Sequence, residues 1–163
     1  MRIVDPQTTL VLVGLIRLPR YRFMSRKCDE LQVVTKMHAQ YVRLFTDERG
    51  ISLFEDKEIE LASGFAVPPA EPLHFAQFFD ADNSFWIGAP TTWKGEESHP
   101  TPRRQIFITV RGEYQVTAGD GALRKFPAGS VLLLEDITGT GHSTRITSAD
   151  DCIVFAVGLR TEQ

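Results

Sequence analysis

Long apolar stretches, paired cysteines and excess positive charge are scarce in this sequence, and each scarcity excludes a class of protein. No apolar stretch approaches the roughly 18–20 residues of a membrane-spanning helix, so we expect no association with a membrane. The two cysteines, Cys28 and Cys152, are too few for a disulfide scaffold and favour a cytoplasmic location. The net charge of -3 gives no electrostatic basis for binding nucleic acid.

What the sequence does contain is enough apolar residues for one folded domain. The 163 residues are 42% hydrophobic, which suits a single globular core. Charge divides the chain unevenly, because residues 1–36 carry seven basic and three acidic residues, whereas residues 37–163 carry 11 basic and 18 acidic residues. We therefore predict an N-terminal extension over residues 1–36 and one domain over residues 37–163.

Residues 1–36 allow three interpretations. They can be a targeting segment, although their apolar residues precede the basic ones, which is the reverse of a secretory signal. They can be an extension that is disordered or not native, with translation starting at Met37. They can also add a strand over residues 8–15 that covers a sheet edge, followed by a weak helix near residues 24–31. We assign no function to this segment.

The rest of the chain has the pattern of an all-β protein. Short segments rich in Val, Ile, Phe and Leu alternate with Gly, Pro, Asp and Asn, and no 11-residue stretch has helical periodicity. Gly119-Asp120-Gly121 supplies the backbone angles of a tight hairpin turn. Many short strands at this spacing indicate a sandwich or a barrel. The predicted strands are residues 41–45, 51–54, 58–62, 73–78, 85–87, 105–110, 114–117, 123–126, 131–134, 143–146 and 153–157.

Residues 95–146 contain the one pattern that suggests chemistry. Its two halves each deliver a histidine, and 16 residues separate the glycine that ends the first half from the glycine that begins the second. The first half consists of His99, Thr101, Gln105 and Gly112, and the second of Gly129, Glu135, Asp136 and His142.

This spacing resembles the two-part motif of the cupin family. Where the first half of the family motif has two histidines and a glutamate, this sequence has His99, Thr101 and Gln105. In the second half Glu135 replaces a proline, and His142 comes two residues later than in the family. Over roughly residues 40–159 the chain resembles uncharacterised bacterial RmlC-like single-domain cupins with a degenerate metal motif. The resemblance implies an all-β double-stranded β-helix, that is, a jelly-roll barrel, with an N-terminal extension.

Cupins commonly hold a divalent metal ion with three histidines and one glutamate. The resemblance therefore implies a metal site at His99, Gln105 and His142, and imidazole ligands suit Fe, Mn, Zn or Ni. Because a threonine occupies one ligand position and Gln105 is uncharged, such a site would hold its metal loosely. Glu135 or Asp136 would supply the missing charge if the two-residue insertion folds inward.

Side-chain alternation along a strand predicts what lines the pocket. If residues 99–109 are extended, one face carries the polar side chains and Phe107, and the other carries aliphatic side chains. We expect the polar face to point into the barrel, where Thr101, Arg103 and Phe107 would bind the substrate. Arg103 would hold a carboxylate or a phosphate. The aliphatic face would pack on a covering strand or on a second subunit.

Glu135 and Asp136 are the candidate catalytic residues. Burial would raise the pKa of their carboxyl groups and suit them to general acid or base chemistry. The simpler alternative is that two acidic residues at the end of a strand form a turn. In the same way, His99 can be a solvated loop residue, and His142 can bond only to backbone.

Three functions remain open at this stage, and whether the protein is an enzyme stays open with them. The first is a metal-dependent enzyme acting on a small carboxylated or carbonyl-bearing molecule. The second is a metal-free cupin, either isomerase-like or epimerase-like or a ligand-binding module, with a vestigial metal site. The third is a structural or interaction module. We expect a small-molecule ligand in the barrel, and a homodimer formed through the aliphatic sheet face.

Overall fold

A computed structural model describes residues 36–65 and 68–160, all of which belong to one compact unit, Thr35–Gln163. These residues form eleven β-strands, and no helix among them could cross a membrane. The three interpretations of residues 1–36 concern a segment that lies almost entirely outside the described residues.

The first described strands form a long antiparallel hairpin. Strand β1 (Met37–Thr46) pairs with β2 (Ser52–Phe65) over ten successive positions, and β3 (Leu73–Phe75) pairs with the end of β2. The sequence predicted two short strands, 51–54 and 58–62, in place of β2, because Asp56 and Lys57 interrupt the apolar residues. Continuous pairing with β1 carries the strand through these charges, which stay partly or fully exposed.

The remaining eight strands build the barrel. The strand that the sequence did not predict is β5, which contains no large apolar side chain and ends at His99. The strands are β4 (Ala81–Ala89), β5 (Lys94–His99), β6 (Gln105–Arg111), β7 (Glu113–Thr117), β8 (Leu123–Pro127), β9 (Val131–Glu135), β10 (His142–Ile146) and β11 (Cys152–Leu159).

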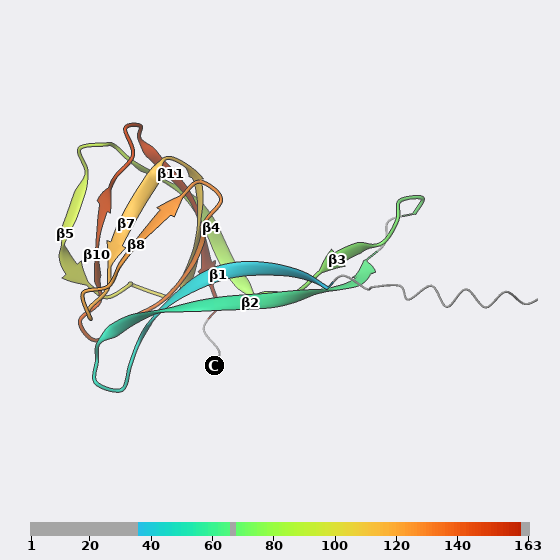
Figure 1. Ribbon diagram of the computed structural model, residues 1–163, viewed down its shortest axis with the longest axis horizontal. Helices are drawn as coiled ribbons and strands as arrows, with labels where there is room; N and C mark the ends of the chain where they lie inside the picture. Colours follow the sequence, from blue (N-terminus) through green and yellow to red (C-terminus); the bar gives the residue numbers. More distant parts are fainter. Residues whose placement is uncertain (1–35, 66–67, 161–163) are drawn as a thin grey trace, which may run out of the picture. The chain divides into compact units, whose positions relative to one another are not determined.

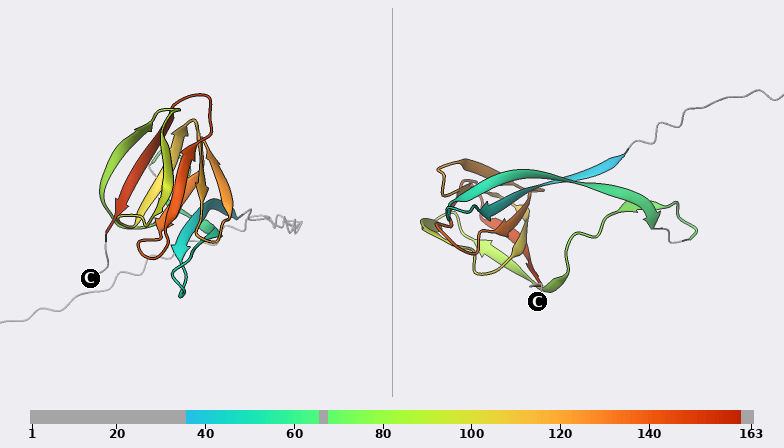
Figure 2. Two further views of the ribbon diagram at one scale, coloured as in Figure 1. Left: turned by 90° about the vertical axis from the view of Figure 1, so that its left-hand side faces the viewer. Right: turned by 90° about the horizontal axis from the view of Figure 1, so that it is seen from below.

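Two facing sheets contain these strands (Figures 1 and 2). The larger sheet has the order β3-β2-β1-β9-β6-β11-β4, and the smaller has the order β5-β10-β7-β8. From β4 to β11 the chain crosses repeatedly between the sheets, so that four strands of each form a jelly roll. The predicted all-β jelly-roll class is therefore confirmed, and the β1–β2 hairpin extends one of its sheets by a parallel pairing of β1 with β9.

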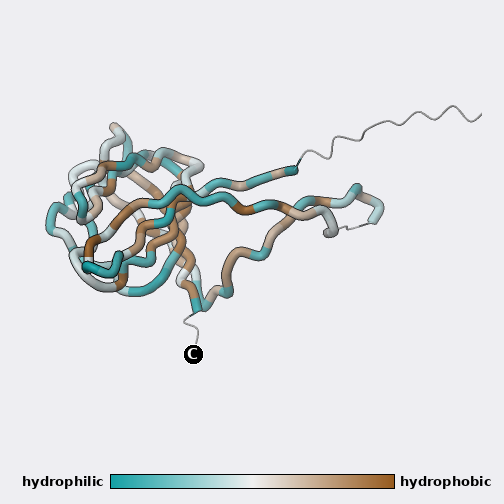
Figure 3. The backbone as a smooth tube through the Cα atoms, turned by 60° about the horizontal axis from the view of Figure 1, so that its bottom comes forward, coloured by the Kyte–Doolittle hydropathy of each residue, from teal (hydrophilic) through white to brown (hydrophobic). Residues whose placement is uncertain are grey.

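The main core lies between the two sheets. Leu132 and Leu134 of β9 face Val116 and Phe126 of the smaller sheet, and all four side chains are at most 2% exposed. Hydrophobic segments recur along the barrel strands, and hydrophilic and hydrophobic segments alternate along the hairpin (Figure 3). This inner packing also explains Cys152, which is a buried free cysteine at 1% exposure, as the sequence suggested.

A second apolar layer covers part of the outer face of the larger sheet. Ile106 and Leu133 are buried there, with Ile108 and Val131 partly buried beside them. The ring of Phe78, from the segment after β3, packs edge-on against Tyr41 at 4.7 Å between centroids. The aliphatic face of β6 thus packs on a covering segment over part of its length, as alternation predicted.

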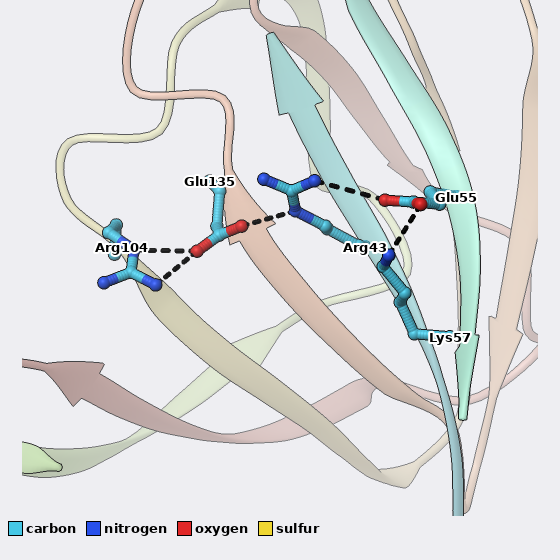
Figure 4. A network of polar contacts seen from close by, with 5 residues as sticks. All are labelled: Arg43, Glu55, Lys57, Arg104 and Glu135. Carbon is cyan, nitrogen blue, oxygen red and sulfur yellow. Dashed lines mark hydrogen bonds and ion pairs between the residues drawn. The ribbon is translucent and has the colours of Figure 1, made fainter. Parts of the chain in front are cut away.

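A chain of ion pairs joins the hairpin to the barrel on this outer face (Figure 4). Glu135, at the end of β9, accepts hydrogen bonds from the Nε atoms of Arg43 at 2.5 Å and Arg104 at 2.8 Å. Arg43 also donates to Glu55 at 3.1 Å, and Lys57 lies 2.6 Å from the same carboxylate. Because the carboxylate of Glu135 is only 12% exposed, it depends on both guanidinium groups for its solvation.

We expect Glu135→Gln to lower the free energy of unfolding at pH 7 by about 2 kcal/mol, since two charge-assisted hydrogen bonds lose their acceptor charge. Burial opposes ionisation of Glu135, but the bonds from Arg43 and Arg104 outweigh it and hold its pKa below the usual range. A lowered folded-state pKa stabilises the fold above the unfolded-state pKa, and the effect is lost as pH falls through the folded-state value.

Urea unfolding of both proteins at pH 7 and at acid pH measures this dependence, and the difference between them should shrink at acid pH. Glu96→Gln is the matched control, because Glu96 is 71% exposed and lies 3.7 Å from Lys94. A Glu135→Gln effect that is the same at both pH values would contradict the assignment.

Candidate functional site

The two motif histidines meet at one end of the smaller sheet. His99 ends β5, His142 begins β10, and the two residues are directly paired across the strands. Their ring centroids are 5.4 Å apart. Gly141 permits this approach: its φ is +63°, and a Cβ atom there would lie 2.0 Å from the carbonyl carbon of His99. Glycine at this position is therefore a condition for bringing the imidazoles together.

The two-residue insertion before His142 folds against the β1–β2 turn. Thr140 donates its backbone N–H to the carbonyl of Gly50 at 2.8 Å, and Thr46 donates its hydroxyl to the carbonyl of Thr138 at 2.8 Å. Ser52, which is fully buried, donates to the carbonyl of Gly141 at 2.5 Å. The N-terminal hairpin thus holds in place the loop that delivers His142.

Asp136 is the buried acid of the site. Its residue exposure is 0%, and its carboxylate accepts hydrogen bonds from the Thr101 hydroxyl at 2.7 Å and from Nδ1 of His142 at 2.6 Å. Its backbone carbonyl also accepts the N–H of Thr101 at 2.9 Å. Thr101, 2% exposed, therefore positions Asp136, which in turn positions His142.

This arrangement fixes the orientation of the His142 ring. A carboxylate oxygen only accepts hydrogen bonds, so Nδ1 carries the proton that it donates to Asp136. In the neutral ring Nε2 is then left with a lone pair, on the edge that points away from Asp136. His142 can accept a hydrogen bond or a proton at Nε2, and Asp136 stabilises the imidazolium that results.

His142 lines a cavity of about 160 Å³ between the two sheets. The wall is mostly apolar and includes Phe107, Leu132 and Val154 of the larger sheet. Trp93, which is 41% exposed in the β4–β5 connection, also lines it. A small pocket with an apolar wall and a few polar groups is the usual form of a small-molecule site.

The other predicted site residues take different positions. Phe107 lines the cavity, as expected, whereas the hydroxyl of Thr101 already donates its hydrogen bond to Asp136. Gln105 is 6% exposed and lies on β6, in the sheet that faces the two histidines. Arg103 is exposed outside the cavity, with its guanidinium 5.4 Å from the centroid of the Phe85 ring. His99 is also exposed and is not part of the cavity wall.

One expectation about the candidate catalytic pair needs correction. The sequence predicted that burial would raise the pKa of Glu135, but the bonds from Arg43 and Arg104 outweigh burial and lower it. Glu135 and Asp136 are adjacent at the end of a strand, so their side chains point to opposite faces of the sheet. Glu135 faces the arginines on the outer face, and only Asp136 faces the histidines.

The side chains present do not fit a firmly held metal ion. Within residues 36–65 and 68–160, no group of three or more His, Cys, Asp or Glu side chains is arranged to hold one. The two acids that could complete a ligand set with the histidines already have partners. Asp136 binds Thr101 and His142, and Glu135 binds two arginines. Two imidazoles and the neutral amide of Gln105 form a weak donor set.

Comparisons with known proteins give structural similarity without sequence similarity. No family model matches the chain, and no curated protein matches it. A cupin 2 conserved barrel domain protein from Salinispora arenicola is 18% identical, covers 63% of this chain and 76% of its own length, and has a TM-score of 0.39. The Cnp3 cupin domain of Schizosaccharomyces pombe is 12% identical, with coverages of 77% and 84% and a TM-score of 0.39. An ethanolamine utilization protein Q from Salmonella typhimurium is 11% identical, with coverages of 77% and 99% and a TM-score of 0.34.

The chain has the cupin fold. The strand order carries this assignment without the comparisons, because β5 pairs with β10 in one sheet and β6 pairs with β9 in the other, so that the strands of the two motif halves pair with each other in both sheets. The similarity to solved cupins, at these identities, says nothing about a metal or a reaction. What this protein can do must be argued from its own residues.

Sequence reasoning missed two residues that shape the site, Ser52 and Tyr114. Ser52 gave no signal, since a serine in a strand rarely reveals a long-range partner. Tyr114 lines the cavity, but aromatic residues in strands are usually core. The Thr101–Asp136 bond was also missed, although both residues were singled out separately.

We expect Thr101→Val to lower the free energy of unfolding by about 1–3 kcal/mol, because it leaves a fully buried carboxylate oxygen without a donor. Thr147→Val is a matched control: its hydroxyl donates to Glu113 at the same 2.7 Å, but in a partly exposed position where water can replace it. Urea unfolding compares the two. Equal losses would argue against a special role for the buried bond.

Proposed function

We propose that this protein is a metal-independent cupin that binds a small molecule in the cavity between its sheets. His142, oriented by Asp136, accepts a hydrogen bond or a proton from that molecule. The proposal is carried by one observation, the 2.6 Å contact between Nδ1 of His142 and a fully buried Asp136, with His142 in the cavity wall.

The reaction class that this geometry favours is proton transfer. A histidine with a free Nε2 and a carboxylate behind Nδ1 is a suitable general base for isomerisation or epimerisation. A ligand-binding module would use the same atoms for a hydrogen bond alone. The metal-dependent alternative requires His99, Gln105 and His142 to bind a cation without a carboxylate. It is less favoured because the carboxylates of Asp136 and Glu135 already bind other side chains.

Arg103 supports a carboxylated ligand. Its guanidinium lies over Phe85 and forms none of the ion pairs found among the described residues. Because Arg103 is outside the cavity, the carboxylate of a ligand would stay near the surface while the apolar part enters between the sheets. This arrangement suits a molecule with one charged end, in a protein that we expect to be cytoplasmic.

The metal-independent proposal predicts that a phenol, which presents an acidic O–H to Nε2, binds without a cation. We expect p-cresol to bind the full chain equally well with and without EDTA, as measured by calorimetry. His142→Phe should weaken binding about tenfold, the loss of one hydrogen bond.

His74→Phe, the same substitution at an exposed histidine of β3, should leave p-cresol binding unchanged. Elemental analysis of the purified protein completes the experiment. A stoichiometric metal that is lost in His142→Phe, together with binding that EDTA abolishes, would refute metal independence and restore the metal-dependent alternative.

We further propose that a second copy of the chain covers the exposed part of the outer sheet face. Trp86 is 65% exposed and packs at 4.9 Å between centroids against Phe155, next to Ile108 and to Val110, which is 49% exposed. An apolar row across three strands is a surface that the same row of a second copy would cover about a two-fold axis.

Light scattering at micromolar concentration should give twice the 18.3 kDa chain mass. Trp86→Lys should shift the protein to a monomer, because it replaces the largest exposed apolar side chain of the row with a charge. Leu123→Lys is the control, since Leu123 is 60% exposed in the other sheet. A wild-type monomer at these concentrations would rule the dimer out.

A further inference from the structure

The cavity has polar groups at two levels, and only one of them belongs to the site described above. His142 is the first residue of β10, and Tyr114 is paired with Ile146, the last residue of that strand. The two levels are set by the first and the last residue of one five-residue strand, and both side chains reach into the same space. Both His142 and Tyr114 line the cavity. A ligand that fills it therefore has one end near each.

Tyr114 and Thr109 are buried without hydrogen-bond partners. Tyr114 is 4% exposed and Thr109 is 1% exposed, yet neither the phenol oxygen nor the threonine hydroxyl bonds to any residue that the structure describes. Burial raises the pKa of the Tyr114 phenol, and the nearby Thr109 hydroxyl only partly opposes this. The phenol therefore remains a protonated donor at any physiological pH.

Thr109 belongs to the same level of the barrel as Tyr114. It lies on β6, four residues beyond Gln105, and is paired with Val154, a residue of the cavity wall. Thr109 is not itself in the cavity wall, but its hydroxyl lies near the phenol of Tyr114, which is. Buried hydroxyls nearly always have a hydrogen-bond partner in folded proteins. Two buried hydroxyls without one, next to the same cavity, therefore suggest that a ligand supplies the missing partner.

We infer that Tyr114 and Thr109 form a second polar subsite of the cavity, which binds a hydroxyl or carbonyl oxygen of the ligand. The inference rests on the proposed function and specifies its ligand. A dry cavity of about 150 Å³ accommodates benzene, so the present cavity of about 160 Å³ takes a body of one small ring or a short chain. The ligand class is then a small molecule with an apolar body and a polar group at each end.

Three probes of the same shape test this subsite: p-xylene with no hydroxyl, p-cresol with one, and hydroquinone with two. Their affinities are measured by calorimetry, under nitrogen, for the full chain and for Tyr114→Phe. Tyr114→Phe should weaken hydroquinone about tenfold, as expected for one hydrogen bond, and leave p-xylene within about twofold. Thr109→Val is a second variant of nearly equal volume, for which the same pattern is expected with a smaller loss.

Thermal unfolding without ligand gives an independent readout. Because the Tyr114 hydroxyl has no partner among the described residues, its removal should leave the Tm of Tyr114→Phe unchanged or raise it. A marked fall in Tm would mean that the hydroxyl is bonded within the protein, and the subsite would be refuted.

The binding results separate this inference from the proposed function. Loss of hydroquinone affinity in His142→Phe but not in Tyr114→Phe or Thr109→Val would refute the second subsite and leave the function of His142 intact. Loss in Tyr114→Phe but not in His142→Phe would support the subsite and refute the proposed role of His142. Failure of all three probes to bind the wild-type chain would refute both.

Discussion

A fully buried carboxylate, that of Asp136, is the constraint on which the arrangement of the site depends. A charge without solvent must find donors within the protein, and Asp136 finds them in Thr101 and His142. These donors come from the β5–β6 connection and from β10, so the carboxylate ties both motif halves together. The result is an imidazole whose orientation is set by charge pairing, at the edge of an apolar cavity. The geometry of a proton acceptor is therefore a consequence of satisfying one buried group.

The neighbouring residue, Glu135, has a different role on the opposite face of the sheet. Glu135 binds Arg104 and Arg43, and through Arg43 it attaches the β1–β2 hairpin to the barrel. The same hairpin supplies the turn and the buried serine that support the loop before His142. The two consecutive acids at the end of β9 thus act together. Glu135 attaches the hairpin to the barrel, and the hairpin supports the loop that places His142 against Asp136.

The resemblance to the cupin motif predicted the barrel and a site shared by His99 and His142. The two rings do lie 5.4 Å apart, but only His142 lines the cavity, because His99 is exposed. Sequence reasoning failed at β5, since Lys94–His99 is an exposed edge strand without the apolar alternation that reveals a strand. It also grouped Glu135 with Asp136 as one catalytic pair. Their separation depends on where the strand ends and on which long-range partners lie on each face, and Arg43 is 92 residues away in the sequence. Contacts of this kind leave no local pattern to detect.

The composition of the cavity wall indicates how affinity and selectivity are divided. Its aliphatic and aromatic side chains contribute binding energy through burial of apolar area, which any ligand of suitable size provides. Selectivity must then come from the few polar groups, because a buried donor or acceptor that finds no partner penalises the wrong ligand. Among the polar residues of this cavity are His142 at one level and Tyr114 at the other, with Thr109 near Tyr114. For a ligand bound as we propose, a molecule that satisfies only one level would leave the polar group of the other level unpaired and would bind less well.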